Sequence, residues 1–185
     1  MFKLLPAYLL ISALIFSHCR LDDPQIPNEE ELITTLRYTL TPVNGGNSAV
    51  FTFQDYDGEG GEDPLISGGV LTANTEYTGS LEILNEISFP LVDIGQEIQT
   101  EDTEHQFFLA TSGGLLANVE YADTDSNGHP VGLITKLITR SVSSGNLTIT
   151  LRHEPDKTAP GVSKGDLSQA GGETDLEIVF DVQIQ

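Results

Sequence analysis

Hydrophobic and polar residues alternate with a period of two along most of the chain after residue 31, which is the pattern of half-buried β-strands. The last strand has the clearest pattern, with five apolar residues on one face: Leu176, Ile178, Phe180, Val182 and Ile184. Polar and charged residues, among them Glu177, Asp181 and Gln183, occupy the other face. We therefore predict that the C-terminal end of the chain pairs within a sheet.

The same signature predicts strands over seven further stretches: 32–40, 49–54, 68–72, 76–84, 106–111, 115–121 and 147–152. Residues 131–139 are apolar on both faces, as in a central strand, and are an eighth. The first two stretches are separated by Pro42 and by Asn44-Gly45-Gly46, which indicates a hairpin. Residues 92–104 differ, because Ile94 and Ile98 are four apart among polar residues, as in a short helix or an ordered acidic loop. The pattern predicts an all-β fold, an antiparallel two-sheet sandwich of immunoglobulin or fibronectin type, with about eight to nine strands in one domain over residues 32–185.

The N-terminal segment has the composition of an export signal. Lys3 precedes an apolar run, residues 4–16, that is too short to span a bilayer as a helix, so residues 1–18 are predicted to be a signal peptide. Phe16-Ser17-His18-Cys19 resembles the lipobox of bacterial lipoproteins, although the position before the cysteine is usually a small residue. The resemblance implies a lipid at Cys19 and a flexible tether over residues 19–31. The alternative is an ordinary secreted protein cleaved near this point.

Two further resemblances concern location. Arg20-Leu21-Asp22-Asp23 is similar to the acidic signal that sends lipoproteins of Bacteroidota to the exterior face of the outer membrane. Residues 28–32, 71–85, 151–157 and 171–175 together resemble uncharacterised lipoproteins of that group. Some of those proteins carry the label of a type 1 periplasmic-binding fold, which the strand-only pattern does not support because that fold alternates strands with helices. The resemblance implies an outer-membrane lipoprotein and no particular activity.

The charge of the chain limits its partners. It contains 28 Asp and Glu against 8 Lys and Arg, a formal net charge of −20. Such a surface repels nucleic acid and attracts cations and basic surfaces, so we expect no nucleic-acid partner. The expected partners are the membrane, through the lipid anchor, and an outer-membrane transporter or another surface protein. The predicted function is that of a surface-tethered, non-enzymatic binding or accessory domain.

Two acidic loops have oxygen donors at alternate positions, as calcium loops do: Asp123, Asp125 and Asn127 in one, and Asp55, Asp57 and Glu59 in the other. Neither completes an EF-hand, because position twelve is Ile134 in the first loop and Ile66 in the second. Calcium as a cofactor is the prediction for both loops. The alternative is an acidic turn that uses Asp and Gly for their backbone preferences.

Three histidines outside the leader each stand beside an acid or a turn: His105, His129 and His153. Imidazole and carboxylate together suit zinc or another transition metal, and two histidines suit haem iron, so a metal or haem capture lipoprotein is an alternative function. No two of them have a ligand spacing within one helix or strand, which favours ordinary surface histidines. An enzyme acting on extracellular polymers is a further alternative, but no catalytic signature is present and no catalytic residue is predicted.

Overall fold

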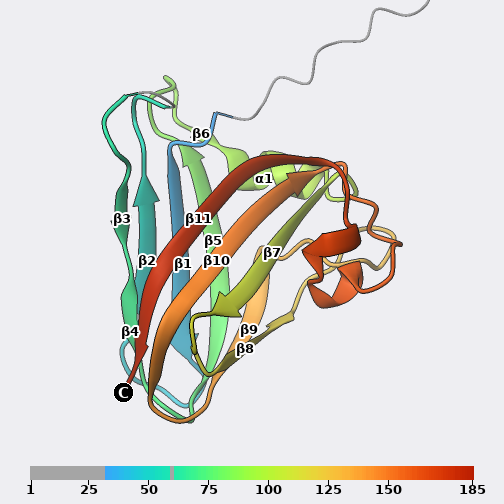
Figure 1. Ribbon diagram of the computed structural model, residues 1–185. Coiled ribbons are helices and arrows are strands. Elements are labelled where there is room, and N and C mark those ends of the chain that lie inside the picture. The colour runs from blue at the N-terminus through green and yellow to red at the C-terminus, as the bar shows by residue number, and fades with distance from the viewer. Residues whose placement is uncertain (1–31, 59–60) are drawn as a thin grey trace, which may run out of the picture.

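The computed structural model describes residues 32–58 and 61–185, and it confirms an all-β sandwich of two sheets (Figure 1). The predicted signal peptide, Cys19 and the tether lie outside the described residues, as does Glu59. The strands are β1 (Thr35–Pro42), β2 (Ala49–Gln54), β3 (Leu65–Ser67), β4 (Gly69–Leu71), β5 (Glu76–Asn85), β6 (Val92–Asp93), β7 (His105–Ser112), β8 (Ala117–Tyr121), β9 (Ile134–Thr139), β10 (Ser143–His153) and β11 (Glu173–Ile184). The helices are α1 (Ile94–Thr100) and the short 3-10 helices η1 (Val162–Lys164) and η2 (Leu167–Gln169).

The larger sheet has the strand order β3-β2-β1-β5-β9-β8, with β6 also paired to β5, and the smaller has the order β4-β11-β10-β7. All pairs are antiparallel except β4 with β11, which run parallel. The nine predicted strands are present, and the structure adds β3 and β6. These two strands have three and two residues, too few for alternation to be recognisable in the sequence.

Alternation along each strand places one apolar face in the core between the sheets. Leu36, Tyr38 and Leu40 of β1 are completely buried, and the predicted hairpin with β2 sets Leu36 opposite Phe53. Ile178 and Phe180 of β11 face the same core from the smaller sheet. Burial of this apolar area is the main stabilising contribution to the sandwich.

Gly79 leaves space for the side chain of Tyr38 to pass over β5 in the middle of the larger sheet. Gly79 of β5 lies between β1 and β9, where the hydroxyl of Tyr38 bonds to that of Thr135 at 2.7 Å. A Cβ atom at Gly79 would come within 2.4 Å of the Thr135 hydroxyl oxygen, so a side chain there would separate the pair. Burial raises the pKa of Tyr38 to about 12, against the smaller opposing effect of its bond to Thr135.

The helix predicted within residues 92–104 is α1. Asp93 caps it by accepting a hydrogen bond from the backbone N–H of Gln96, and Ile94 and Ile98 are buried against the core. The helix ends at Thr100, and its C-cap residue Glu101 lies four residues before β7 begins at His105. It therefore fixes the chain that enters β7.

The long segment between β10 and β11 covers the outer face of the smaller sheet. Val162 of η1 and Ala170 pack on Phe108 in a second, small apolar cluster. The side-chain amide of Gln106 donates to the carbonyl of Val162 at 3.0 Å, which ties this segment to β7. The two short helices project beside β7 at the right in Figure 1.

Candidate metal centre

Two of the three histidines meet at one end of the smaller sheet. His105 begins β7, His153 ends β10, and the register of these antiparallel strands sets them directly opposite each other. Directly opposite residues project on the same face, so the two rings lie side by side with their centroids 4.7 Å apart. His105 is completely buried and His153 is partly buried, so His105 is not the surface histidine that the sequence favoured.

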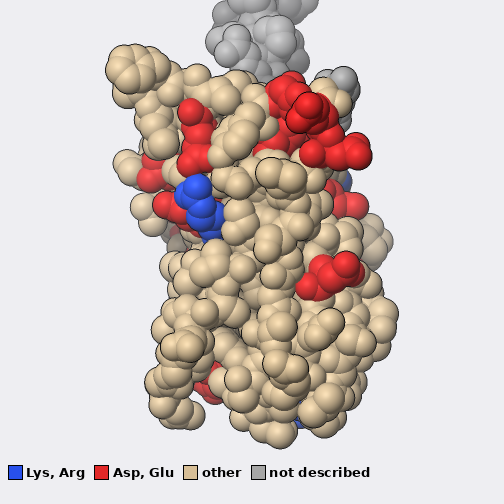
Figure 2. All heavy atoms as spheres, turned by 90° about the vertical axis from the view of Figure 1, so that its left-hand side faces the viewer, with Lys and Arg blue, Asp and Glu red and all other residues tan. Residues whose placement is uncertain are grey.

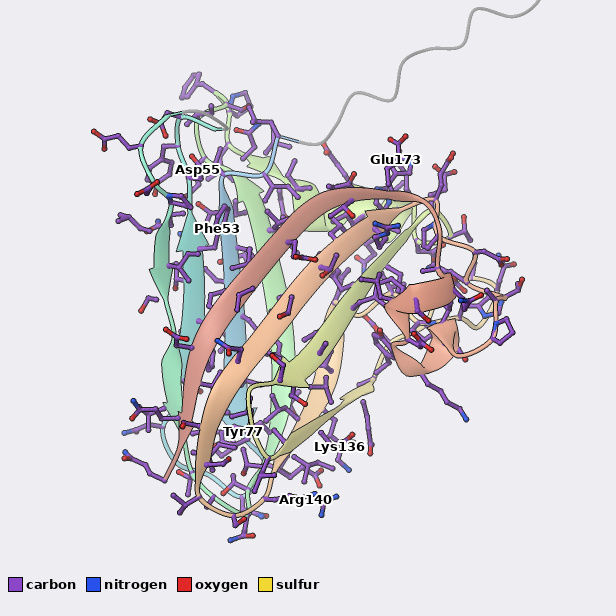
Figure 3. All side chains as sticks on the ribbon, in the orientation of Figure 1. Phe53, Asp55, Tyr77, Lys136, Arg140 and Glu173 are labelled. Carbon is purple, nitrogen blue, oxygen red and sulfur yellow. The ribbon has the colours of Figure 1, made fainter. Side chains whose placement is uncertain are left out.

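A β-bulge brings a carboxylate to the same place. Leu151 pairs with Leu176, but Arg152 pairs with Thr174, so Asp175 is an extra residue in β11. Bulges re-aim side chains that strict alternation would turn to the other face. One ligand atom each from His105, His153 and Asp175 lies within 4.8 Å of the other two. In Figure 1 the start of β7, the end of β10 and the start of β11 converge at this end, and Figure 3 marks it with Glu173, the register partner of His153.

Two glutamates extend the group toward solvent. Glu104 and Glu154, both exposed, have carboxylate oxygens within 4.8 Å of each other and of a ring nitrogen of His153. The backbone N–H of Glu154 donates to the carbonyl of Glu104 at 2.6 Å, and Glu154 adopts a left-handed conformation with a φ of 49°. The turn after β10 is thereby fixed to the strand that carries His105.

The hydrogen bond and the burial of His105 give its ring a fixed orientation and a lowered pKa, both of which suit a metal ligand. Its Nδ1 donates to the carbonyl of Glu101 at the end of α1, at 3.3 Å, so Nε2 is the atom that would bind an ion. Histidine ligands commonly donate their other ring N–H to such a carbonyl. Burial is the main cause that lowers the pKa of His105, with a smaller contribution from His153, and the lowered pKa keeps the ring in the neutral form that a metal requires.

The donor set fits a borderline transition metal better than a hard cation. Two imidazoles and one carboxylate suit Zn²⁺ or Fe²⁺, whereas Ca²⁺ prefers six or more oxygens. In tetrahedral zinc sites with bonds of about 2.0–2.1 Å, ligand atoms are roughly 3.3 Å apart. The group of 4.8 Å would therefore contract by about 1.5 Å at most around an ion. Three protein ligands would leave a fourth position for water or another ligand.

His129 belongs to neither group of possible ligands among the residues that the structure describes. Its backbone N–H donates to Asp125 at 2.8 Å, within the first predicted calcium loop. The structure thus separates the three histidines into a pair and a loop residue. The pairing depends on strand register, which spacing along the sequence does not reveal.

The first predicted calcium loop is organised around a lysine. Lys157 Nζ donates to three oxygens, at 3.0 Å from the Asp125 carboxylate, 2.5 Å from the Asp102 carbonyl and 3.1 Å from the Pro130 carbonyl. The side chains of Lys157 and Asp125 are 5% and 0% exposed. The other carboxylate oxygen of Asp125 accepts from the backbone N–H groups of Asn127 and His129. An ammonium group therefore holds the place that a cation would take beside Asp125.

Two other predicted calcium ligands, Asp123 and Asp55, accept hydrogen bonds from backbone N–H groups. Asp123 accepts from the backbone N–H groups of Gly132 and Ile134, both at 2.8 Å. Asp55 accepts from Gly58 at 2.8 Å in a local turn. Figure 3 places Asp55 at the end of the molecule where β2 finishes, away from the histidines. Calcium at either loop stays a prediction, and the geometry favours the transition-metal alternative at the histidines.

Within the described residues, no helix has the length and apolarity that crossing a membrane requires. Comparison of the chain with protein-family models, curated proteins and solved structures finds no match. The function must therefore be argued from the site itself.

Proposed function

We propose that this protein is an exported, membrane-tethered binding domain whose ligand is a divalent transition-metal ion, zinc above all. The ion would be held by His105, His153 and Asp175. The observation that carries the proposal is the convergence of these three side chains from three different strands on one point at the end of the smaller sheet. The proposal combines the binding-domain and metal-capture hypotheses from the sequence.

Each of the three residues contributes something that metal binding needs. His105 is buried and oriented by α1, so its ring is fixed before an ion arrives. His153 is partly exposed and lies between the buried ring and the solvent-facing glutamates, which gives an ion a route of entry. Asp175 supplies a negative charge that offsets part of the charge of the ion. Glu104 and Glu154 add an attractive field at the entrance.

Zinc titration by calorimetry tests the proposal. Wild-type protein is expected to bind one zinc ion, and His153→Ala is expected to weaken binding by about 100-fold, since it removes one of three ligands. His129→Ala is the matched control, because His129 lies in the loop of Asp125 and away from the proposed ligands, and its zinc affinity is expected to be unchanged. Equal affinity in all three proteins would refute the proposed site.

The tether is a separate part of the proposal, supported by the sequence resemblance at Cys19. Two or three acyl chains give firm anchoring, whereas one chain gives marginal binding. Labelling with a palmitate analogue in a bacterial host is expected in the wild type and not in Cys19→Ser. Labelling that persists in the variant would refute the anchor without affecting the metal site.

A further inference from the structure

An apolar loop projects from the end of the sandwich where β5 finishes. Ile87 and Leu91 are each 53% exposed, and Phe89 is fully exposed at 102%. These residues alternate along loop 86–91, between β5 and β6, so three large apolar side chains stand in solvent within five positions. Isolated exposed apolar residues are normal, but a group of them marks an interaction surface.

The base of this loop is held in place. β6 pairs with β5 through Leu84 and Asn85, which closes the loop at both ends. The Asn85 side chain accepts from the backbone N–H of Ser88 at 3.1 Å. The apolar side chains are therefore presented from a fixed base.

The described chain begins beside the same base. The backbone N–H of Thr34 donates to the Leu84 carbonyl at 3.0 Å, and the Thr34 hydroxyl accepts from the backbone N–H of Glu86 at 2.8 Å. Leu32, the first described residue, is itself 50% exposed. Figure 1 shows the start of β1 and the end of β5 at the same end of the sandwich.

We infer that loop 86–91 contacts the bilayer to which the chain is tethered, with Phe89 at the level of the lipid headgroups. This inference rests on the proposed anchor at Cys19. The twelve residues from 20 to 31 can span at most about 40 Å, and they join the domain beside the loop. The tether therefore enters the domain at the end that carries Ile87, Phe89 and Leu91, and its length lets this end reach the bilayer. Aromatic and aliphatic side chains favour this interfacial position.

The charges around the loop determine which lipid headgroups it is expected to contact. Figure 2 shows Asp and Glu gathered at this end of the face that it displays, whereas the rest of that face has few charges. At the base of the loop, Glu86 is paired with Arg37 at 2.9 Å. The other acids would repel anionic headgroups, so the contact is expected to be stronger with zwitterionic lipid.

Tryptophan fluorescence gives a direct test, because the chain contains no tryptophan. Phe89→Trp places the fluorophore in the loop, and Val142→Trp is the matched control. Val142 is 71% exposed and lies two residues after Arg140, which Figure 3 shows at the opposite end. Each chain, starting at Cys19, would be coupled through its cysteine thiol to maleimide-lipid in phosphatidylcholine vesicles with brominated acyl chains.

We expect the emission of Phe89→Trp to shift to shorter wavelength and to fall at least twofold relative to vesicles without bromine, while the emission of Val142→Trp does not change. Adding phosphatidylglycerol should reduce the effect. Equal emission of Phe89→Trp with and without bromine would overturn the contact and would point to a protein partner for the loop. Because the coupling is chemical, this result does not depend on whether cells acylate Cys19.

Discussion

The histidine group (His105, His153 and Asp175) and the Lys157 loop (residues 123–129, whose Asp125 accepts from Lys157) both gather oxygen and nitrogen donors, but a lysine of the chain enters only the second. In the loop, the ammonium of Lys157 bonds three oxygens, including one of Asp125. In the group of His105, His153 and Asp175, the donors are two imidazole rings and one carboxylate, with no lysine or arginine among the three. An acidic loop therefore indicates a cation site only where no lysine or arginine of the chain occupies the position of the ion.

The two regions are connected through one short segment. Glu101 offers its carbonyl to His105, and the next residue, Asp102, offers its carbonyl to Lys157. Asp102 also accepts from the backbone N–H of Ser126 at 3.0 Å. The Lys157 loop thus supports the segment that orients His105, which is a structural role.

Removing the lysine should have the largest effect. Lys157→Met leaves the buried Asp125 without its cation, and loss of one partner of a buried ion pair costs about 3–5 kcal/mol of unfolding free energy. Lys164→Met, at an exposed lysine, is the control and should change it by less than about 0.5 kcal/mol. Urea unfolding measures both. Stabilisation of Lys157→Met alone by calcium would show that the predicted calcium loop is competent once the ammonium is gone.

Two glycines in left-handed conformations, one beside the histidine group and one in the Lys157 loop, differ in the space around them. Gly172, with a φ of 68°, packs against the backbone of His153, and a Cβ atom there would lie 2.1 Å from the His153 carbonyl oxygen. Gly128, with a φ of 86°, lies in the Lys157 loop and has open space around it. Alanine in a left-handed conformation costs about 1–2 kcal/mol.

Gly128→Ala should therefore lose about 1–2 kcal/mol of unfolding free energy and keep its zinc affinity. Gly172→Ala should lose more and should also bind zinc more weakly, because relieving the clash moves His153. Thermal unfolding and zinc calorimetry on both variants measure the difference. Unchanged zinc affinity in Gly172→Ala would separate the turn from the metal centre.

The smallest expected effect is a pH dependence that belongs to the Lys157 loop. Burial acts to raise the pKa of Asp125, but its hydrogen bonds with His129, Lys157 and Asn127 prevail, so the pKa lies below its usual value of 3.8. Since the unfolded chain then takes up the proton first, this stabilisation is present above pH 3.8 and is lost as the pH falls through the folded pKa.

The unfolding free energy of the wild type should consequently fall more steeply as the pH drops below 3.8 than that of Asp125→Asn, which has no carboxylate to protonate at this position. Urea unfolding at a series of pH values measures the two slopes. Parallel slopes would contradict the assignment of the ion pair to Asp125.

The sandwich could be predicted from the sequence because most strands are long enough for buried and exposed residues to alternate visibly. The five inward residues of β11, the β1–β2 hairpin and the two isoleucines of α1 are all local signals. His105 and His153 could both be named from the sequence as possible metal ligands. Their pairing was not predictable, because it depends on the register of β7 against β10.

Two participants were missed altogether. Asp175 is the third residue of β11 and would lie on the opposite face from His153 without the bulge, which the alternation pattern does not predict. Lys157 stands in a loop, and its three oxygen partners come from segments distant in sequence. The alternating oxygen donors from Asp123 to Asn127 are visible in the sequence, but the contact of Lys157 with Asp125 is not.

Anomalous diffraction at the zinc edge, from crystals grown with one equivalent of zinc, would locate the bound ion. We expect one strong peak bounded by His105, His153 and Asp175, with bonds of about 2.0–2.2 Å. We expect no peak beside Asp125 while Lys157 is present. A peak in the Lys157 loop, or no peak at the histidine group, would contradict the proposed zinc site.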